Sequence, residues 1–525
     1  MPSVAGWVSF ATVNVAMLLD LPSMICFDQT AVIDVDGTEV TYGDLRAKVS
    51  QAAGLLASLG VTAGDRVGIL GTNRVAFLEV LFGALSLGAT VVPMNYRAGK
   101  DEAAHLIADS GTKVLVTEQR YVSLIDSVRP ASLEHVLLFD GDWAERRDAA
   151  EPNELVEDVE DDVLATLLYT SGTTSLPKGV MLKHGAITGY IMGTNECADG
   201  EDHGRMLLAA PLYHVAGLTS TLIALYAGRV VVMLSQFDVA EWLTAVQQHK
   251  VTHAFLVPTM LARLLDDENL AGADLSSLEG VTYGAAPMPP SVIRRAIDVF
   301  PRTVSFSQSY GQTETTATVA VLDPDDHRIW EGTPAEQEVK LRRLRSVGKV
   351  LDDVEIQVCD EGGNPVGPNT PGEVWLRTFR AMDGYWGNQE KTRVTVDGSG
   401  WVHTGDLGYL DEDGYLFLSG RHGDMIIRGG ENIAPDEVEA VLYEHPDVIE
   451  AAVVGVPDET WGERVVAAVV LRPGASTDTI AAHARDHLAS FKRPEEILTF
   501  DELPRTSTGK LVRRNLLPLV EERLA

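Results

Sequence analysis

The chain has 525 residues, of which 45% are hydrophobic and 22% charged, and its formal net charge at pH 7 is −34. This length exceeds one ordinary hydrophobic core, so two or more domains are expected, and the composition is that of a globular protein rather than a disordered one. The acidic balance repels nucleic acid and anionic membrane surfaces, which excludes both as expected general partners.

The cysteine content and the chain ends predict a cellular compartment. Cys26, Cys197 and Cys359 are far apart in the sequence and lack the spacing of a zinc site. This usage indicates a reducing environment without a disulfide framework. No apolar run is long enough to cross a membrane, no Lys or Arg precedes the first apolar stretch, and the last residues form no targeting tripeptide. We therefore expect a cytoplasmic protein.

The first 140 residues alternate short apolar strands with helical periodicity. Strands are predicted at residues 66–70, 90–93, 113–117 and 135–139, and a helix at 76–87. Strand–helix–strand units at this spacing indicate a parallel sheet covered by helices. A solvated acidic connection at 151–162 then leads to a buried strand at 163–168.

The stretch that follows, residues 169–182, reads Tyr-Thr-Ser-Gly-Thr-Thr-Ser-Leu-Pro-Lys-Gly-Val-Met-Leu. Its small residues let backbone N–H groups approach a phosphate closely, its hydroxyls add donors, and Lys178 adds a mobile positive charge. It differs from the common nucleotide-binding loop because no Ser or Thr follows the lysine. The stretch predicts a phosphate cradle.

The alternation resumes after this loop, with strands predicted at 206–210, 229–233, 253–257, 280–283 and 304–307 and helices at 239–249, 259–265 and 290–300. Ligand-binding loops in such sheets lie at the carboxyl ends of strands, where 211–217, 283–288 and 309–314 are found. Short β segments at 348–420 predict a mostly antiparallel subdomain. The rest predicts a small α+β domain, with helices at 436–444 and 477–488, strands at 449–456 and 465–471, and a basic, loop-like end at 503–510.

Eight motifs follow one another in a fixed order, which is far more specific than any one of them. They lie at 169–182, 211–217, 283–288, 310–314, 401–407, 420–424, 429–433 and 508–510. In this order, from about residue 41 to residue 510, the chain resembles the adenylate-forming superfamily, in its acyl-CoA synthetase or carboxylate–CoA ligase branch.

The resemblance implies a fold and a reaction. The expected fold is a large α/β N-terminal domain at 1–420, with doubly wound sheets and the β-rich subdomain at 348–420. A hinge at 421–424 and a small mobile α+β C-terminal domain at 425–525 follow. The implied reaction joins a carboxylate to the α-phosphate of ATP, releases pyrophosphate, and passes the acyl group to a thiol. ATP, Mg²⁺ and coenzyme A are the implied cofactors and co-substrate.

The resemblance also assigns residues that would hold the two anions of the reaction, the ATP phosphates and the substrate carboxylate. The β- and γ-phosphates would be held by Thr170, Ser171, Gly172, Thr173, Thr174 and Lys178. Glu314 matches the Mg²⁺ ligand, a hard oxygen donor suited to that ion, with Thr170 beside it. Lys510 matches the lysine that reaches between the carboxylate and the α-phosphate during adenylation.

The other matches concern the nucleoside, the acyl group and the thiol. Tyr310 matches the aromatic residue that stacks on adenine, followed by Gly311 and by Thr313 near the α-phosphate. Asp406 would accept the ribose hydroxyls beside Arg421, and Gly430 would lie on the face used for thiol attack. His214 matches the gate of the acyl pocket, and the segment beside nucleotide and acyl group would be Gly284, Ala285 and Ala286.

Two positions depart from the family pattern. Ser175 stands where glycine is usual; if the position needs a positive φ, serine costs about 1–2 kcal/mol there, and its hydroxyl is an added donor. Gly423 stands where the hinge usually has Asp or Lys. Glycine widens the accessible backbone range, so rotation is expected to remain possible.

The sequence leaves several functions open. A carboxylate–CoA ligase is favoured, because residues 218–223 supply no aspartate to pair with the amino group of an α-amino acid and because 215–218 are apolar, which suits a hydrophobic or ring-bearing acid. An acyl-AMP ligase that loads a carrier protein is the second reading. A catalytically weak nucleotide-binding sensor is the third, suggested by Ser175 and Gly423. The acid itself and the oligomeric state, with a homodimer among the options, are not determined.

Overall fold

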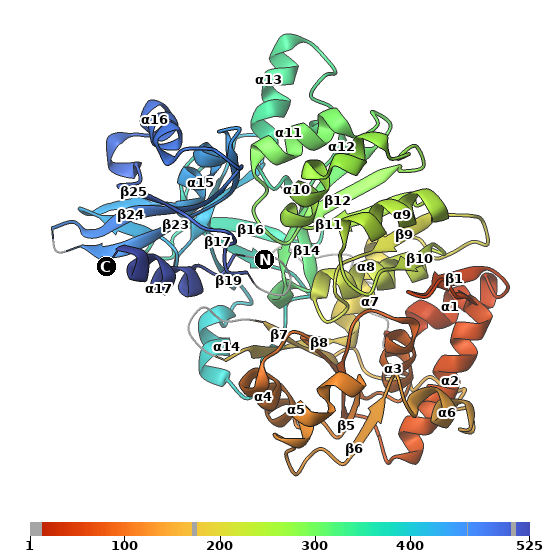
Figure 1. Ribbon diagram of the computed structural model, residues 1–525. Helices are drawn as coiled ribbons and strands as arrows, with labels where there is room; N and C mark the ends of the chain where they lie inside the picture. The colour runs from red at the N-terminus through yellow and green to blue at the C-terminus, as the bar shows by residue number, and fades with distance from the viewer. Residues whose placement is uncertain (1–12, 171–175, 459, 506–510, 525) are drawn as a thin grey trace. The chain divides into compact units, whose positions relative to one another are not determined.

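The computed structural model describes residues 13–170, 176–458, 460–505 and 511–524 (Figure 1). The chain forms two compact units. The first comprises Met1–Phe255, Gly311–Ala317 and Phe379–Val394; the second comprises Leu256–Tyr310, Thr318–Thr378 and Thr395–Ala525. The predicted boundary between residues 420 and 425 differs from this division and stays a prediction.

The first unit is built on a seven-stranded sheet that runs in the order β18-β8-β7-β4-β3-β5-β6. The pairs from β7 to β6 are parallel, and β8 and β18 are added antiparallel at one edge. Strand β4 is buried at every position, as is typical of parallel strands covered on both faces. The strands are β3 (Arg66–Leu70), β4 (Thr90–Met94), β5 (Val114–Thr117), β6 (His135–Leu138), β7 (Leu164–Thr170), β8 (Lys178–Lys183) and β18 (Gly384–Tyr385).

The helices around this sheet are close-packed. At Gly83 of α3, an added Cβ would lie 3.0 Å from the backbone nitrogen of Ala53 in α2, so a side chain there would require the two helices to move slightly apart. Helix α4 ends at Gly111 with φ 62°, the left-handed conformation that terminates helices at low cost in glycine. These helices are α1 (Met17–Ile25), α2 (Tyr42–Ser58), α3 (Val75–Ser86), α4 (Lys100–Ser110), α5 (Val122–Asp126), α6 (Trp143–Asp148) and α14 (Gln389–Thr395).

Further strands of the first unit lie side by side in the order β11-β9-β10-β1-β2, all parallel except β1 with β2. Their bounds are β1 (Thr30–Ile33), β2 (Glu39–Thr41), β9 (Arg205–Leu208), β10 (Val230–Met233) and β11 (His253–Leu256). The helices that accompany them are α7 (His184–Thr194), α8 (Val215–Tyr226) and α9 (Val239–His249).

The second unit contains the order β15-β14-β13-β12 and a separate antiparallel sheet in the order β16-β17-β19-β20. This second sheet confirms the predicted β-rich subdomain. The strands are β12 (Gly280–Gly284), β13 (Ser305–Gln312), β14 (Ala317–Leu322), β15 (Lys349–Val350), β16 (Glu355–Cys359), β17 (Gly372–Arg377), β19 (Val402–Leu410) and β20 (Leu416–Arg421). The helices are α10 (Pro258–Asp266), α11 (Pro290–Val299), α12 (Pro324–His327) and α13 (Pro334–Arg343).

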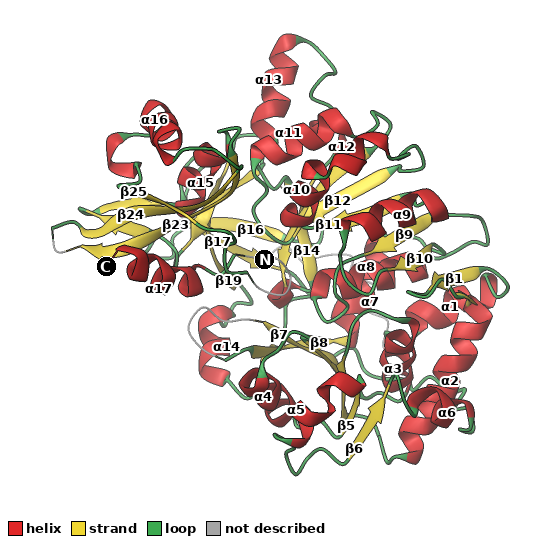
Figure 2. Cartoon of the chain, in the orientation of Figure 1, coloured by secondary structure: helices red, strands yellow, loops and turns green. Residues whose placement is uncertain are grey.

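The C-terminal part of the second unit has its own sheet, in the order β22-β21-β24-β23, with β25 paired to β24 (Figure 2). One apolar cluster joins this sheet to α15 and α16, and another joins it to α17, so both faces are covered. The elements are β21 (Ile426–Arg428), β22 (Glu431–Ile433), α15 (Pro435–Tyr443), β23 (Val448–Asp458), β24 (Gly462–Leu471), α16 (Thr477–His487), β25 (Glu496–Thr499) and α17 (Arg513–Leu524).

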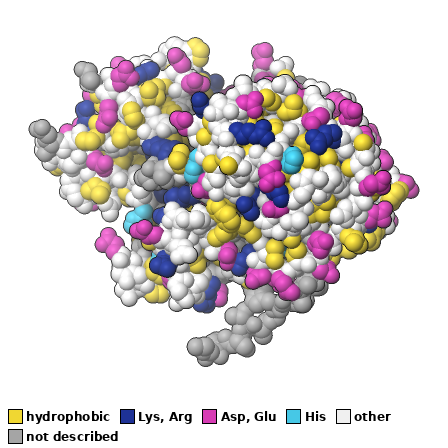
Figure 3. All heavy atoms as spheres, turned by 90° about the horizontal axis from the view of Figure 1, so that it is seen from below, with side chains coloured by type: hydrophobic (Ala, Val, Ile, Leu, Met, Phe, Trp, Pro, Cys, Tyr) yellow, Lys and Arg dark blue, Asp and Glu magenta, His cyan; other side chains and the backbone are white. Residues whose placement is uncertain are grey.

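The α/β class and the order of elements are confirmed, and β3 and α9 have the predicted bounds. In the described part of the chain, no helix is long and apolar enough to cross a membrane. On the face that Figure 3 shows, basic side chains lie scattered among acidic and apolar ones rather than in one stripe.

Candidate active site

The predicted phosphate loop connects two antiparallel strands of the first unit. Thr170 ends β7 and pairs directly with Lys178, which begins β8. A strand therefore follows the loop where the common nucleotide loop has a helix, in agreement with the difference in sequence. Ser171, Gly172, Thr173, Thr174 and Ser175 lie outside the described residues.

Both ends of this loop are fixed by side-chain hydrogen bonds to helix α4, which is distant in the sequence. The Nε2–H of His105, on α4, donates to the carbonyl of Pro177 at 2.8 Å. The hydroxyl of Tyr169 donates to Asp109 at 2.7 Å. At Gly179, an added Cβ would lie 2.8 Å from Leu167 Cδ1, so only glycine fits there without movement. The loop is thus held at its entry and its exit.

Glu314 lies in the same unit, in the short 3-10 helix Thr313–Thr315 after β13. Its Oε1 accepts a hydrogen bond from the hydroxyl of Tyr385 at 2.7 Å, and its carbonyl accepts one from the backbone of Met382 at 2.8 Å. The Tyr385 ring also lies 5.6 Å from the ammonium of Lys178. One tyrosine therefore contacts both the predicted metal ligand and the predicted phosphate lysine.

The turn that carries Glu314 is strained and is supported by a buried arginine. Thr316 and Ala317 have φ values of 51° and 71°, which non-glycine residues rarely adopt. The side chain of Arg380 is fully buried and donates to the carbonyls of Thr315 and Thr316 at 3.3 Å each, while the Thr316 hydroxyl donates to the Arg380 carbonyl at 2.6 Å. Strain of this kind persists only where surrounding contacts impose it, and it is concentrated at functional sites.

The charge of Lys178 is affected by its surroundings. Burial lowers its pKa, the like charge of Lys391 lowers it further, and Glu314 opposes both. A phosphate in the loop would supply the anion that favours the protonated lysine.

The replacement of Tyr385 by Phe removes the hydrogen bond to Glu314 and keeps the ring near Lys178. We expect the Mg²⁺ concentration for half-maximal adenylation to rise by about tenfold, the lower end of what loss of a partner behind a metal ligand costs. Tyr415→Phe is the matched control, because the Tyr415 hydroxyl also donates to a carboxylate, that of Asp326, at 2.8 Å in the second unit. Equal Mg²⁺ dependence in both variants would contradict the role of Tyr385.

In the second unit, the two residues predicted to hold the nucleoside contact each other. The Tyr310 hydroxyl donates to Asp406 Oδ2 at 2.6 Å, and the Arg421 Nε donates to Oδ1 at 2.6 Å. Burial raises the pKa of Tyr310, and the neighbouring Asp406 charge raises it further. A carboxylate has about four acceptor positions, so Asp406 can still accept ribose hydroxyls. The three side chains form one preoriented group.

The segment Gly284, Ala285 and Ala286 follows β12 in the same unit. At Gly284 an added Cβ would lie 2.2 Å from the Ser309 carbonyl of the paired strand β13, so a side chain is excluded. Ala285 has a positive φ of 69°. The backbone of Gly284 therefore lies too close to β13 for a side chain, which agrees with the small residues of this segment.

His214 caps α8. Its Nδ1 accepts a hydrogen bond from the backbone of Ala216 at 3.2 Å, and at Gly217 an added Cβ would lie 2.2 Å from the Pro211 carbonyl. This local role explains the histidine at the helix start, while its role as a gate to the acyl pocket stays a prediction.

The last predicted site residues are Gly430, Lys510, Gly311 and Thr313. Gly430, with Gly429, forms the two-residue turn between β21 and β22, and both have positive φ, as a tight hairpin turn of the I′ type requires. Lys510 lies outside the described residues. Gly311 and Thr313 flank the turn of Glu314, and Thr313 is buried.

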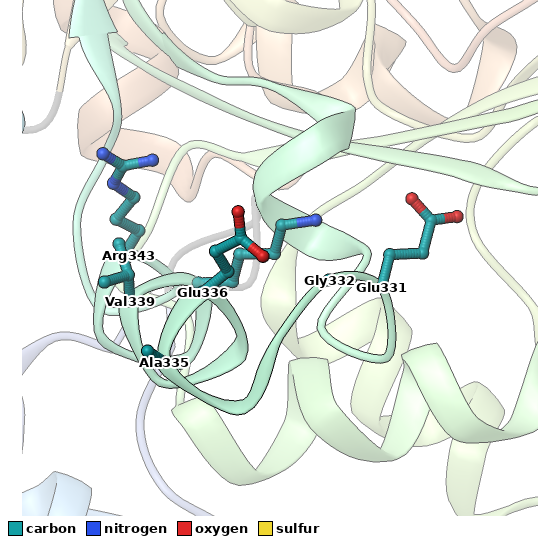
Figure 4. Close-up of a pocket in the computed structure, with 7 residues that line it drawn as sticks. Glu331, Gly332, Ala335, Glu336, Val339 and Arg343 are labelled. Carbon is teal, nitrogen blue, oxygen red and sulfur yellow. The ribbon is translucent and has the colours of Figure 1, made fainter.

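One hollow of about 630 Å³ lies beside α13 (Figure 4). Its lining comes from that helix and the turn before it, and includes none of the predicted site residues. The lining residues are Glu331, Gly332, Ala335, Glu336, Val339, Lys340 and Arg343. It contributes nothing to the candidate active site.

Tyr385 and Arg380 are the main residues that the sequence did not reveal. Their partners Glu314 and Thr316 are 71 and 64 positions away, so no local pattern joins them. The aromatic and glycine residues at 384–387 were the one available signal for Tyr385.

Comparison with known proteins gives the family. The model of the AMP-binding enzyme family matches residues 26–386, and that of the AMP-binding enzyme C-terminal domain matches residues 437–510. A feruloyl-CoA synthase of Amycolatopsis sp. is 38% identical, covering 91% of this chain and 93% of its own. An indoleacetate–CoA ligase of Aromatoleum aromaticum is 35% identical, with 92% and 93% covered. A fatty acid–[acyl-carrier-protein] ligase of Streptomyces coeruleorubidus is 34% identical, with 93% of each chain covered.

Solved structures agree. An anthranilate CoA ligase in complex with anthranoyl-AMP has a TM-score of 0.88 at 27% identity, with 98% of each chain covered. An o-succinylbenzoate CoA synthetase from Bacillus subtilis, in complex with an acyl-adenylate intermediate, has a TM-score of 0.82 at 30% identity, covering 96% of this chain and 98% of the other. This chain is thus a member of the AMP-binding enzyme family and an acid–thiol ligase of its AMP-forming CoA ligase group.

Proposed function

We propose that the enzyme activates a carboxylic acid that carries a ring and transfers it to the thiol of CoA. The observation that carries the choice of substrate class is the agreement of relatives at 35–38% identity over nine-tenths of the chain, whose names give feruloyl and indoleacetyl groups as the acyl part. Both are aromatic acids with a hydrophobic body.

Helix α8 supports an acid without an amino group. Its sequence contains no charged residue, and its buried Thr219 and Thr221 donate their hydroxyls to the helix carbonyls of Val215 and Gly217 at 2.7 and 2.8 Å. An ammonium group taken out of water requires a carboxylate partner, and this helix offers none. An apolar acyl group makes no such demand.

The proposed first step brings the acid carboxylate to the α-phosphate of ATP. The loop from Thr170 to Lys178 holds the β- and γ-phosphates, and Lys510 neutralises the charge that develops as the carboxylate attacks. The bond from the α-phosphorus to the bridging oxygen breaks, and pyrophosphate leaves as the acyl-adenylate forms. Electrostatic stabilisation of this kind is usually the largest contribution to phosphoryl and acyl transfer.

Glu314 suits Mg²⁺, which prefers hard oxygen ligands and usually combines one or two carboxylates with substrate phosphates. Among the described residues no group of three or more His, Cys, Asp or Glu could hold a metal ion by itself, which fits an ion that depends on ATP. Bound there, Mg²⁺ would neutralise phosphate charge. Tyr385 orients the Glu314 carboxylate for it.

For the second step, the C-terminal part presents an aromatic surface next to the Gly429–Gly430 turn. Trp461 is 51% exposed and packs on Gly429, where an added Cβ would lie 2.9 Å from the indole ring. Arg428 lies 5.8 Å from the Trp461 ring centre and donates to the carbonyl of the half-exposed Phe491 at 2.9 Å. An exposed indole next to a cation suits a nucleotide base, which CoA carries and a pantetheinyl carrier protein lacks.

Trp461→Ala should raise the KM for CoA about tenfold or more, because stacking of a base on an aromatic side chain contributes about 1–3 kcal/mol. Adenylation should not change. Pantetheine, which lacks the adenine nucleotide, is the control thiol, and its reaction should be equal in the two proteins. An equal loss with pantetheine and CoA would contradict base stacking at Trp461.

A ligase that loads a carrier protein is the second candidate, supported by the fatty acid–[acyl-carrier-protein] ligase among the relatives. Parallel assays with CoA and with a phosphopantetheinylated carrier protein separate the two. The proposed function requires a higher kcat/KM with CoA. A nucleotide sensor, in contrast, would show no acid-dependent pyrophosphate exchange.

We further propose the domain arrangement that the sequence suggests, with residues 425–525 rotating about Gly423 between the two steps. The two sheet faces of this part are covered by its own helices, which supports a body with its own core.

A further inference from the structure

A cluster of ionic side chains in the C-terminal part has no role in the chemistry proposed so far. Arg513, the first residue of α17, donates from Nη1 to Asp424 at 3.2 Å and from Nη2 to Asp436 at 2.5 Å and to both oxygens of Glu439 at 2.7 and 2.8 Å. Its Nε donates to the carbonyl of Val453 at 3.3 Å. One guanidinium thus joins residue 424, α15, β23 and α17.

The cluster depends on its arginine. Three carboxylates surround one cation, and the side chains of Arg513 and Glu439 are only 19% and 12% exposed. Burial raises the pKa of Glu439 above its ordinary value, and Asp436 adds to this rise while Arg513 opposes it. Only the planar fork of an arginine reaches carboxylates on several sides at once, so lysine is no equivalent.

The position of the cluster joins two parts of the proposed mechanism. Asp424 directly follows Gly423, and its N–H donates to the Arg421 carbonyl at 3.0 Å, which closes the turn at the proposed pivot. At the other end, Arg513 comes three residues after Lys510. The residues just before and just after 506–510 are paired with each other through their backbones.

The pairing on either side of 506–510 is explicit. The N–H of Val512 donates to the Pro504 carbonyl at 2.9 Å, and Arg505 forms an antiparallel bridge with Leu511. The Arg505 guanidinium also lies 2.9 Å from Glu450 of β23. Arg505 and Leu511, the described residues on either side of 506–510, therefore both lie on the body that Arg513 holds together.

We propose that Arg513 is a positioning residue for adenylation. Its guanidinium ties Asp424, which follows the pivot residue Gly423, to α15, β23 and α17. When the chain rotates at Gly423, these elements therefore move as one rigid body. This inference rests on the proposed roles of Lys510 and Gly423. Arg513 acts through Lys510 and not on the substrate.

The test is a double-mutant cycle of Arg513→Ala and Lys510→Ala, assayed in both half-reactions. Arg513→Ala should slow acid-dependent acyl-AMP formation by on the order of 10²-fold, the cost of misplacing a reacting group by about 1 Å. Thioester formation from supplied acyl-AMP should be largely kept. In the Lys510→Ala background, Arg513→Ala should cause no further loss of adenylation, because residues that act as a unit are not additive.

Two further variants keep the test valid if Arg513→Ala folds poorly. Asp424→Asn weakens only the tie to the pivot and leaves Arg513 with Asp436 and Glu439; it should reproduce the unequal loss at a nearly unchanged melting temperature. Arg523→Ala is the matched control, because Arg523 is on the same helix but donates to Thr499 and lies over Phe500. It should leave both half-reactions unchanged.

The outcomes separate this inference from the proposed function. Suppose that Lys510→Ala abolishes most adenylation, but Arg513→Ala and Asp424→Asn slow both half-reactions equally. The positioning role is then wrong and the proposed function stands. The same conclusion follows if the rate loss of Arg513→Ala multiplies with that of Lys510→Ala in the double variant. If Lys510→Ala spares adenylation, the role of Lys510 fails first, and with it the basis of the inference.

Discussion

The Lys510→Ala variant should lose adenylation by roughly 10²–10³-fold, the usual cost of removing one donor that stabilises developing charge. Thioester formation from supplied acyl-AMP should remain largely intact. The reason is that the ammonium group acts only while the acid carboxylate approaches the α-phosphate, where two anions meet. Once the adenylate has formed, the Lys510 ammonium no longer contributes to the reaction.

The measurement compares the two half-reactions on the same preparation. Acyl-AMP formation is followed by pyrophosphate release without CoA, and the second step is started by adding acyl-AMP and CoA. Lys510→Arg tests whether position as well as charge matters, and it should recover only part of the first step. An equal loss in both half-reactions would mean that Lys510 supports the protein as a whole.

The Gly423→Pro variant should damage one half-reaction strongly and mostly spare the other. Gly423 is the third residue of the turn from Arg421 to Asp424, in which the Asp424 N–H bonds the Arg421 carbonyl. Proline fixes φ near −65°, so it would hold the pivot in one backbone conformation. A rotating domain requires at least two.

Two control variants separate the effect of a fixed backbone torsion at Gly423 from the effect of an added side chain and from a general loss of stability. An added Cβ at Gly423 meets no atom within 4 Å and its φ is not positive, so Gly423→Ala should retain both steps. Gly398→Pro places a proline at the second residue of the turn from Asp397 to Gly400, a position that accepts proline, so this variant should retain both steps. Full activity of Gly423→Pro in both half-reactions would place the pivot elsewhere.

Much of the fold follows from period and composition. Short apolar runs of four or five residues bounded by turns predicted β3 and β4 within one residue, because buried parallel strands need a nearly continuous hydrophobic sequence. Helix α9 begins at its Asp238 cap, whose side chain accepts from Ala240 and Glu241, a signal visible in the sequence.

Other elements gave weaker signals. Helix α17 was missed because it contains Pro518 and buries only Leu516 and Val520, so its apolar face is narrow. Strand β8 was hidden because it begins inside the stretch identified as a phosphate loop and carries a lysine at each end. Both elements are defined by their partners, β23 and β7, rather than by their own pattern.

The candidate site shows the same division. The chemistry of Lys178, Glu314 and Asp406 could be assigned from motifs, since hydroxyls, glycines and charges stand at fixed spacings. The side chains that orient Glu314 and its turn, Tyr385 and Arg380, contact partners 71 and 64 positions away. Such contacts are made by the tertiary fold, and a single sequence does not contain them in readable form.

The most direct test of the proposed function is the kcat/KM for acyl-CoA formation with a panel of acids, measured with saturating ATP and CoA. The panel contains ferulate and indole-3-acetate as ring-bearing acids, a linear fatty acid of similar carbon number, and phenylalanine as an aromatic acid with an α-amino group. We predict the highest kcat/KM for a ring-bearing acid without the amino group, with AMP and pyrophosphate as co-products in equal amounts. A preference for the linear acid or for phenylalanine, or thioester formation on a carrier protein but not on CoA, would contradict it.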